Sequence, residues 1–132
     1  MKVTELKVGD WVVCNSEPLR IAEINLFLCS AWDKNEDFHG GISIDRLTPI
    51  PLTSEILEKN GWKNDNKDED LWFIMYALGK LCIEFHEWKD CGMLALVSVR
   101  NGEDDVPLLH IKHIHELQHL LWALGIDDDL KI

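Results

Sequence analysis

Short apolar runs that end at turn residues make up most of this chain, and this pattern favours strands over long helices. In residues 1–51, turn-like segments rich in Gly, Asn, Asp and Pro separate the strand-like runs. These runs lie at residues 11–14, 19–24, 26–29 and 41–45. Four or five short strands in so short a stretch predict a small β-barrel over residues 1–51 that closes its own edges.

Residues 52–132 predict an α+β subdomain. Thr53 is a suitable N-cap for a short helix that ends at Gly61, and an almost entirely polar segment, residues 63–70, is expected to form a loop. Three apolar runs separated by turns then predict an antiparallel β-meander, at residues 71–77, 81–88 and 93–99, and a short fourth strand is expected near 108–111. The whole chain of 132 residues has room for these two small subdomains and little more.

A last helix is expected from about Lys112 to Leu124, with Gly125 ending it. Apolar residues recur three and four positions apart along it, so that one face is expected to pack on the meander: Ile114, Leu117, Leu120, Leu121 and Leu124. At about 100° per residue, His115 and His119 lie nearly opposite this stripe. The two histidines are therefore expected to face away from the sheet.

The segment His115-Glu116-Leu117-Gln118-His119 matches the pattern H-E-x-x-H. In zinc metallopeptidases this spacing places two imidazoles on one metal ion, and the glutamate acts as general base on the bound water. The segment therefore supports an alternative hypothesis, in which His115 and His119 bind zinc and Glu116 is catalytic.

A catalytic zinc ion needs a third protein ligand, which usually lies downstream of the second histidine. The thirteen residues after His119 contain no His, Cys or Glu, and the three aspartates at 127–129 could reach a metal only if the chain turned back at Gly125. An upstream ligand from His39, His86 or His110 would be atypical. The favoured interpretation is a surface helix without catalytic residue, cofactor or metal, and a non-catalytic metal or pH-sensing role is a further alternative.

The charge balance excludes one large class of partner. Thirteen Lys and Arg stand against 24 Asp and Glu, for a net charge of −11, whereas affinity for nucleic acid comes mainly from basic side chains. Acidic runs near Asp65, Glu103 and Asp127 leave one alternative, an acidic decoy that occupies the DNA groove of a host defence or regulatory protein.

Other features indicate a cytoplasmic protein without membrane contact. No run approaches the roughly 18 apolar residues of a membrane span, and no signal peptide is recognisable. The four cysteines lack the spacing of a zinc ribbon and are expected to be reduced, although a disulfide between Cys82 and Cys91 across a hairpin is geometrically conceivable.

The six tryptophans divide into two groups. Trp11, Trp72 and Trp32 fit strand positions with a role in the core, whereas the other three lie near turns or on the less apolar side of the last helix: Trp62, Trp88 and Trp122. Core packing is the favoured role, but several tryptophans exposed together would form an interaction patch.

Three segments carry a family resemblance: Leu6–Val12 (LKVGDWV), Pro49–Trp62 (PIPLTSEILEKNGW) and Ile114–His119 (IHELQH). In this order and spacing they resemble a family of small uncharacterised bacterial proteins, encoded largely by prophages and other mobile elements of gut anaerobes. In that family the residue equivalent to Glu116 can be Gln and that equivalent to His119 can be Asn. The resemblance therefore implies that H-E-x-x-H is a coincidence of composition here.

The opening KVGDWV is also similar to the first strand of SH3-like barrels, which implies an SH3-like barrel for residues 1–51 but no particular ligand. Together these features favour a non-enzymatic protein-interaction module in a phage or mobile-element context, with an unidentified protein partner.

Overall fold

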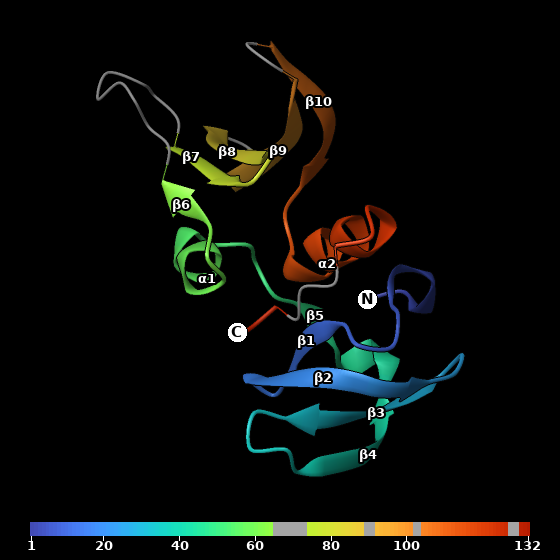
Figure 1. Cartoon of the computed structure of the whole chain (residues 1–132). Helices are drawn as coiled ribbons and strands as arrows, with labels where there is room; N and C mark the ends of the chain where they lie inside the picture. The colour runs from blue at the N-terminus through green and yellow to red at the C-terminus, as the bar shows by residue number, and fades with distance from the viewer. Residues whose placement is uncertain (65–73, 89–91, 102–103, 127–129) are drawn as a thin grey trace. The chain divides into compact units, whose positions relative to one another are not determined.

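The computed structural model describes residues 1–64, 74–88, 92–101, 104–126 and 130–132 (Figure 1). Within them the chain has an α+β fold, with two antiparallel sheets and the helices α1 (Ser54–Lys59) and α2 (Ile114–Ala123). Neither of these helices has the length and apolar character needed to cross a membrane. The chain divides into two compact units: unit 1 holds Met1–Pro51 and the segment from His113 that includes α2, and unit 2 holds Leu52–Lys112.

The sheet of unit 1 has the strand order β4-β3-β2-β1-β5. Its strands are β1 (Trp11–Cys14), β2 (Glu17–Ile24), β3 (Leu28–Asp33), β4 (Phe38–Ser43) and β5 (Thr48–Pro49), and the 3-10 helices η1 (Val3–Glu5) and η2 (Ile44–Arg46) precede β1 and β5. Since β4 and β5 are its edges, the sheet is open. The barrel that was expected to close its own edges within residues 1–51 is therefore not closed.

The β1–β2 hairpin sets the two faces of this sheet. Asn15 and Ser16 form its turn with positive φ angles of 52° and 66°, as tight hairpin turns require. Cys14 then pairs with Glu17, and this register directs alternate residues into one hydrophobic core. The core residues contributed by the strands are Val12, Cys14, Leu19, Ile21, Cys29, Ala31 and Ile42. The residues between them form the outer face of the sheet.

The sheet of unit 2 has the order β10-β9-β8-β7-β6. Its strands are β6 (Lys63–Asn64), β7 (Ile74–Leu78), β8 (Leu81–Trp88), β9 (Gly92–Asn101) and β10 (Asp104–Ile111). The predicted meander is confirmed, because β7 pairs with β8 and β8 with β9. The fourth strand, β10, is longer than predicted. The N-cap of α1 is also as predicted, since the Thr53 hydroxyl accepts a hydrogen bond from the Ile56 N–H at 3.3 Å.

Helix α2 begins and ends within the predicted limits, but it groups with unit 1 rather than with residues 52–132. The physical reason is a set of hydrogen bonds from Gln118 and His119 to residues 9–11, more than a hundred positions earlier in the chain. Several positions discussed above lie outside the described residues: 65–70, Trp72, Cys91, Glu103 and 127–129.

Candidate functional site

The first residues of α2 form a capping box. The Glu116 Oε1 atom accepts a hydrogen bond from the His113 backbone N–H at 3.1 Å and lies 2.9 Å from the His113 Nδ1 atom. A carboxylate in this position satisfies an otherwise unpaired N–H at the start of the helix and suits the positive end of its dipole. Glu116 therefore stabilises the helix terminus in this structure.

Asp10 connects α2 to the turn before β1. Its side chain is fully buried, accepts a hydrogen bond from the Lys7 N–H at 2.7 Å, and lies 2.8 and 2.9 Å from the His119 Nε2 atom through its two oxygens. Burial raises the pKa of the Asp10 carboxyl group, and the hydrogen bonds from Lys7 and His119 oppose this shift. The Nε2 atom of His119 is thus already hydrogen-bonded to a carboxylate.

Gln118 adds a second connection between the same two segments. Its side-chain amide donates to the Gly9 carbonyl and accepts from the Trp11 N–H, both at 3.0 Å. Gln118 is 2 % exposed, so these bonds satisfy two backbone groups in a buried environment. Residues 9–11 and α2 are therefore joined by polar contacts.

His115 is also buried, with 5 % of its surface exposed. Its ring stacks on that of His113 and meets that of His119 edge-on, with 5.7 Å between centroids in both pairs. Its Nδ1 atom has no hydrogen-bond partner among the described residues, and burial lowers the pKa of the imidazole. We call Asp10, His113, His115, Glu116 and His119 the α2 cluster.

These positions correct the prediction that the two histidines lie on an exposed surface of the helix. His115 is buried and His119 is bonded to buried Asp10, whereas Leu124 of the predicted apolar stripe is 45 % exposed. Ile114, Leu117 and Leu121 of the predicted stripe are fully buried as expected. A second face of the helix is buried as well, because Gln118 and His119 form hydrogen bonds with residues 9–11. The surface-helix interpretation therefore does not hold for His115.

The zinc hypothesis for this motif stays a prediction. Metal binding through the Nε2 atom of His119 would require this atom to leave Asp10, and general-base catalysis would require Glu116 to leave His113. Two of the three proposed residues thus have structural partners that compete with the peptidase roles.

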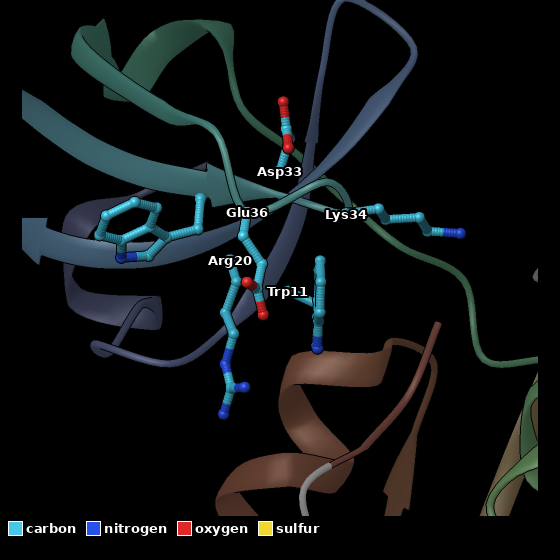
Figure 2. A pocket seen from close by; sticks show the side chains of 6 residues that line it. Trp11, Arg20, Asp33, Lys34 and Glu36 are labelled. Carbon is cyan, nitrogen blue, oxygen red and sulfur yellow. The ribbon is translucent and has the colours of Figure 1, made fainter.

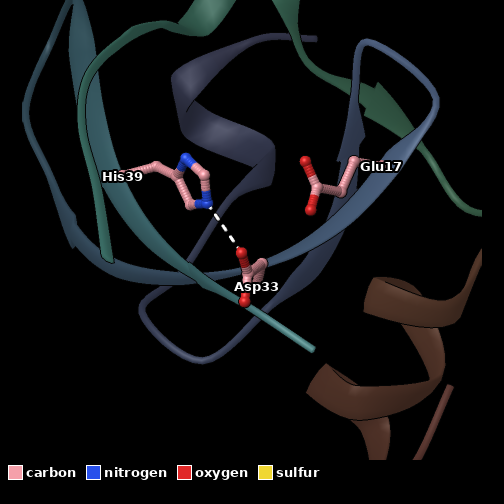
Figure 3. Close-up of side chains that lie close together, drawn as sticks. All are labelled: Glu17, Asp33 and His39. Atoms are coloured by element: carbon pink, nitrogen blue, oxygen red, sulfur yellow. Dashed lines mark hydrogen bonds and ion pairs between the residues drawn. The ribbon is translucent and has the colours of Figure 1, made fainter. Parts of the chain in front are cut away.

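A second histidine cluster lies on the sheet of unit 1 and was missed by the sequence analysis. Glu17, Asp33 and His39 come from the start of β2, the end of β3 and the start of β4, and Figure 3 shows their side chains converging. Each offers one potential ligand atom, and the three atoms lie within 4.8 Å of one another. We call these three residues the rim cluster.

Hydrogen bonds hold two residues of the rim cluster, Asp33 and His39, in place. The His39 Nε2 atom lies 2.8 Å from Asp33 Oδ2, and Asp33 Oδ1 accepts from the Asn35 and Asp37 N–H groups at 2.8 and 3.0 Å. The bond to His39 is the main cause that lowers the pKa of Asp33, and the same bond raises the pKa of His39. The pair therefore favours a carboxylate facing a protonated imidazole.

The outer face of the same sheet carries a row of large side chains. Trp11 pairs with Arg20, Arg20 with Trp32, and Trp32 with Phe38 across four neighbouring strands. We call these four residues the outer-face row. The Trp32 and Phe38 rings meet edge-on at 4.9 Å between centroids, and the two side chains are 45 % and 54 % exposed.

A hollow of about 530 Å³ opens beside this row. It is lined by Trp11, Arg20, Trp32, Asp33, Lys34 and Glu36. In Figure 2 the side chains of Trp11, Arg20 and Glu36 point to the same side, whereas Lys34 points away. Aromatic, cationic and anionic groups thus line one hollow.

The tryptophans differ from their predicted roles. Trp32 is exposed and Trp11 is half-buried, although both were expected in the core, whereas Trp62 is 2 % exposed. Strand alternation alone could not assign the faces, but the register of the β1–β2 hairpin places Trp11 and Arg20 opposite each other on the outer face.

The cysteines that the structure describes are buried free thiols: Cys14, Cys29 and Cys82. Because Cys91 lies outside the described residues, the Cys82–Cys91 alternative stays a prediction.

Searches with this chain against protein-family models, curated proteins and solved structures find no match.

Proposed function

We propose that this chain is a non-enzymatic protein-interaction module and that the outer-face row of unit 1 contacts the partner. The observation that carries the proposal is the row itself, in which two tryptophans, an arginine and a phenylalanine follow one another across four strands. Tryptophan and arginine are the residues most enriched at the energetic centres of protein interfaces.

The setting of the row supports this role. Trp32 and Phe38 are large apolar side chains that stay exposed although the core of unit 1 lies on the other face of the same sheet. They project from paired strands, so little conformational entropy would be lost in ordering them when a partner binds. The neighbouring hollow of about 530 Å³ could receive a partner side chain between aromatic and charged walls.

We further propose that residues 1–51 are related to the SH3-like barrels. The support is the order β4-β3-β2-β1-β5 and the 3-10 helix η2 directly before the last strand. A fold relation does not define a ligand. The mobile-element context and the cytoplasmic location stay predictions.

The test compares two phenylalanines of unit 1. Phe38 belongs to the outer-face row, whereas Phe27, in the turn between β2 and β3, is 76 % exposed but lies outside the row. Cross-linking and affinity purification from the native host, followed by titration of the purified partner, should give a partner that binds wild type and Phe27→Ala equally. Phe38→Ala and Trp32→Ala should each weaken binding at least about tenfold.

Equal binding by wild type and the Phe38→Ala and Trp32→Ala variants would contradict the assignment of the row. Absence of any reproducible partner would contradict the interaction-module proposal itself. Circular dichroism of each variant establishes that its fold is retained.

The two alternatives have less support. A peptidase role uses Glu116 and His119, which are hydrogen-bonded to His113 and Asp10. The acidic-decoy hypothesis depends on the runs near Asp65, Glu103 and Asp127, which lie outside the described residues. Both stay predictions.

A further inference from the structure

We propose that the rim cluster, formed by Glu17, Asp33 and His39, binds a divalent transition-metal ion of the zinc type. The cluster lies on the core-facing side of the unit 1 sheet, opposite the outer-face row. The proposal therefore does not depend on the proposed interaction function.

The strand register places the three side chains on this face. Glu17 pairs with Cys14, Asp33 with Leu19, and His39 with Ala31, and all three of these partners belong to the hydrophobic core. Directly paired residues point to the same face of a sheet. Charged groups thus occupy core-facing positions on three neighbouring strands, at the end of the sheet where the core stops.

The charges of the cluster favour a cation. Asp33 is 7 % exposed, and both of its oxygens are hydrogen-bonded. Glu17 brings a second carboxylate next to it, and no described residue hydrogen-bonds to the Glu17 side chain. Two carboxylates so close together repel each other unless a positive charge lies between them. A bound metal ion would supply two positive charges and engage all three residues.

The donor set indicates which ions would fit. One imidazole nitrogen with two carboxylate oxygens suits zinc and similar transition metals, whereas magnesium and calcium prefer oxygen ligands alone. Ligands at about 2.1 Å in a tetrahedron lie about 3.4 Å apart. The His39–Asp33 distance of 2.8 Å would have to open slightly, and the exposed Glu17 side chain would complete the third contact.

The site is accessible. A hollow of about 280 Å³ is lined by Glu17 and His39, together with Arg46 and core residues of β1 and β4. An ion could enter from this hollow, and a water molecule could occupy the coordination position that three protein ligands leave open.

Isothermal titration of untagged, chelator-treated protein with ZnCl₂ tests the proposal. Wild type should bind one zinc ion, and Glu17→Gln and His39→Ala should each weaken binding at least about tenfold, since each removes one of three ligands. Glu17→Gln preserves side-chain shape and His39 is 41 % exposed, so both variants should fold, as ¹⁵N-correlation spectra would verify. His110→Ala serves as a matched control because His110 is an exposed histidine of β10 in unit 2.

The titration also separates this site from the H-E-x-x-H motif. His119→Ala should leave zinc affinity unchanged, and in NMR spectra zinc should shift the amide signals of residues 17 and 33–39 while sparing those of α2. Three results would overturn the proposal: no zinc binding by wild type, equal binding by Glu17→Gln, His39→Ala and wild type, or loss of binding in His119→Ala with binding retained in His39→Ala.

Discussion

Among its described residues, unit 1 contains two clusters in which histidine meets carboxylate, and the clusters differ in the hydrogen bonds that their carboxylates form. In the α2 cluster, Asp10 bonds the Lys7 N–H and His119, and Glu116 bonds the N-cap residue His113. In the rim cluster, Asp33 is similarly occupied, but Glu17 is exposed, and its side chain forms no hydrogen bond with a described residue.

This difference separates structural from ligand-binding roles among chemically similar groups. A carboxylate that satisfies backbone N–H groups in a buried place cannot move toward a ligand without leaving those groups unpaired, which costs free energy. Asp33 is held in this way through Oδ1, so it can offer only Oδ2 where it stands, and Glu17 is the carboxylate of the rim cluster that can move. An exposed carboxylate beside a His–Asp pair can move at little cost. Substitutions in the α2 cluster should therefore change stability, whereas substitution of Glu17 should change cation affinity.

The largest effect is expected for Asp10→Ala. This change leaves the Lys7 N–H and His119 without their buried acceptor, and it should lower the free energy of unfolding by about 2–3 kcal/mol. Urea unfolding followed by tryptophan fluorescence measures the change. Asp45→Ala, at an exposed position, should change stability by less than about 0.5 kcal/mol. A similar small effect in both variants would show that the Asp10 contacts contribute little.

Gln118→Ala should have the next largest effect. The Gly9 carbonyl and the Trp11 N–H would lose a buried partner, and we expect a loss of about 1–2 kcal/mol. Hydrogen exchange at the Trp11 amide should become faster, because this amide donates to the Gln118 side chain. Leu124→Ala, at an exposed position of the same segment, should leave that exchange rate unchanged.

The contrast between the clusters also explains which features the sequence could predict. The cap at Thr53, the β7–β8–β9 meander and the limits of α2 depend on neighbouring residues, and they match local signals of turn chemistry and periodicity. The orientation of His119 depends on Asp10, 109 positions away. Nothing in the local pattern of α2 indicates that contact.

The rim cluster was hidden for the same reason. Glu17 reads as part of a turn, and Asp33 and His39 read as part of a polar loop. Their proximity becomes visible only when the register of β2, β3 and β4 is known. The H-E-x-x-H motif is visible in the sequence because its spacing is local, although Glu116 and His119 have structural partners.

A pH-dependent effect is expected from His115. Burial lowers its pKa below the ordinary value of 6.5, outweighing the attraction of Asp10 and Glu116 for its proton. Between the lowered pKa and 6.5 the unfolded chain therefore binds more protons than the folded chain, so stability is full above that window and is lost as the pH falls through it. His115→Phe should remove this loss, which amounts to about 1.4 kcal/mol for each unit of pKa lowering.

Urea unfolding of wild type and the His115→Phe variant between pH 7.5 and pH 5 measures this difference in pH-dependent stability. Phenylalanine keeps an aromatic ring beside His113 and His119 but cannot be protonated. Parallel stability profiles for the two proteins would contradict a lowered pKa of His115.

The smallest change in stability is expected for Glu17→Gln, and this variant completes the comparison. The Glu17 side chain is exposed and makes no hydrogen bond with a described residue. In metal-free buffer the substitution should therefore change the free energy of unfolding by less than about 0.5 kcal/mol. With excess zinc, wild type should be stabilised in proportion to the logarithm of free zinc above its dissociation constant, and the variant should gain less. A zinc-dependent stabilisation that is equal in both proteins would place the ion elsewhere. A large loss of stability without zinc would make Glu17 a structural residue like Asp10, and the distinction between the two clusters would fail.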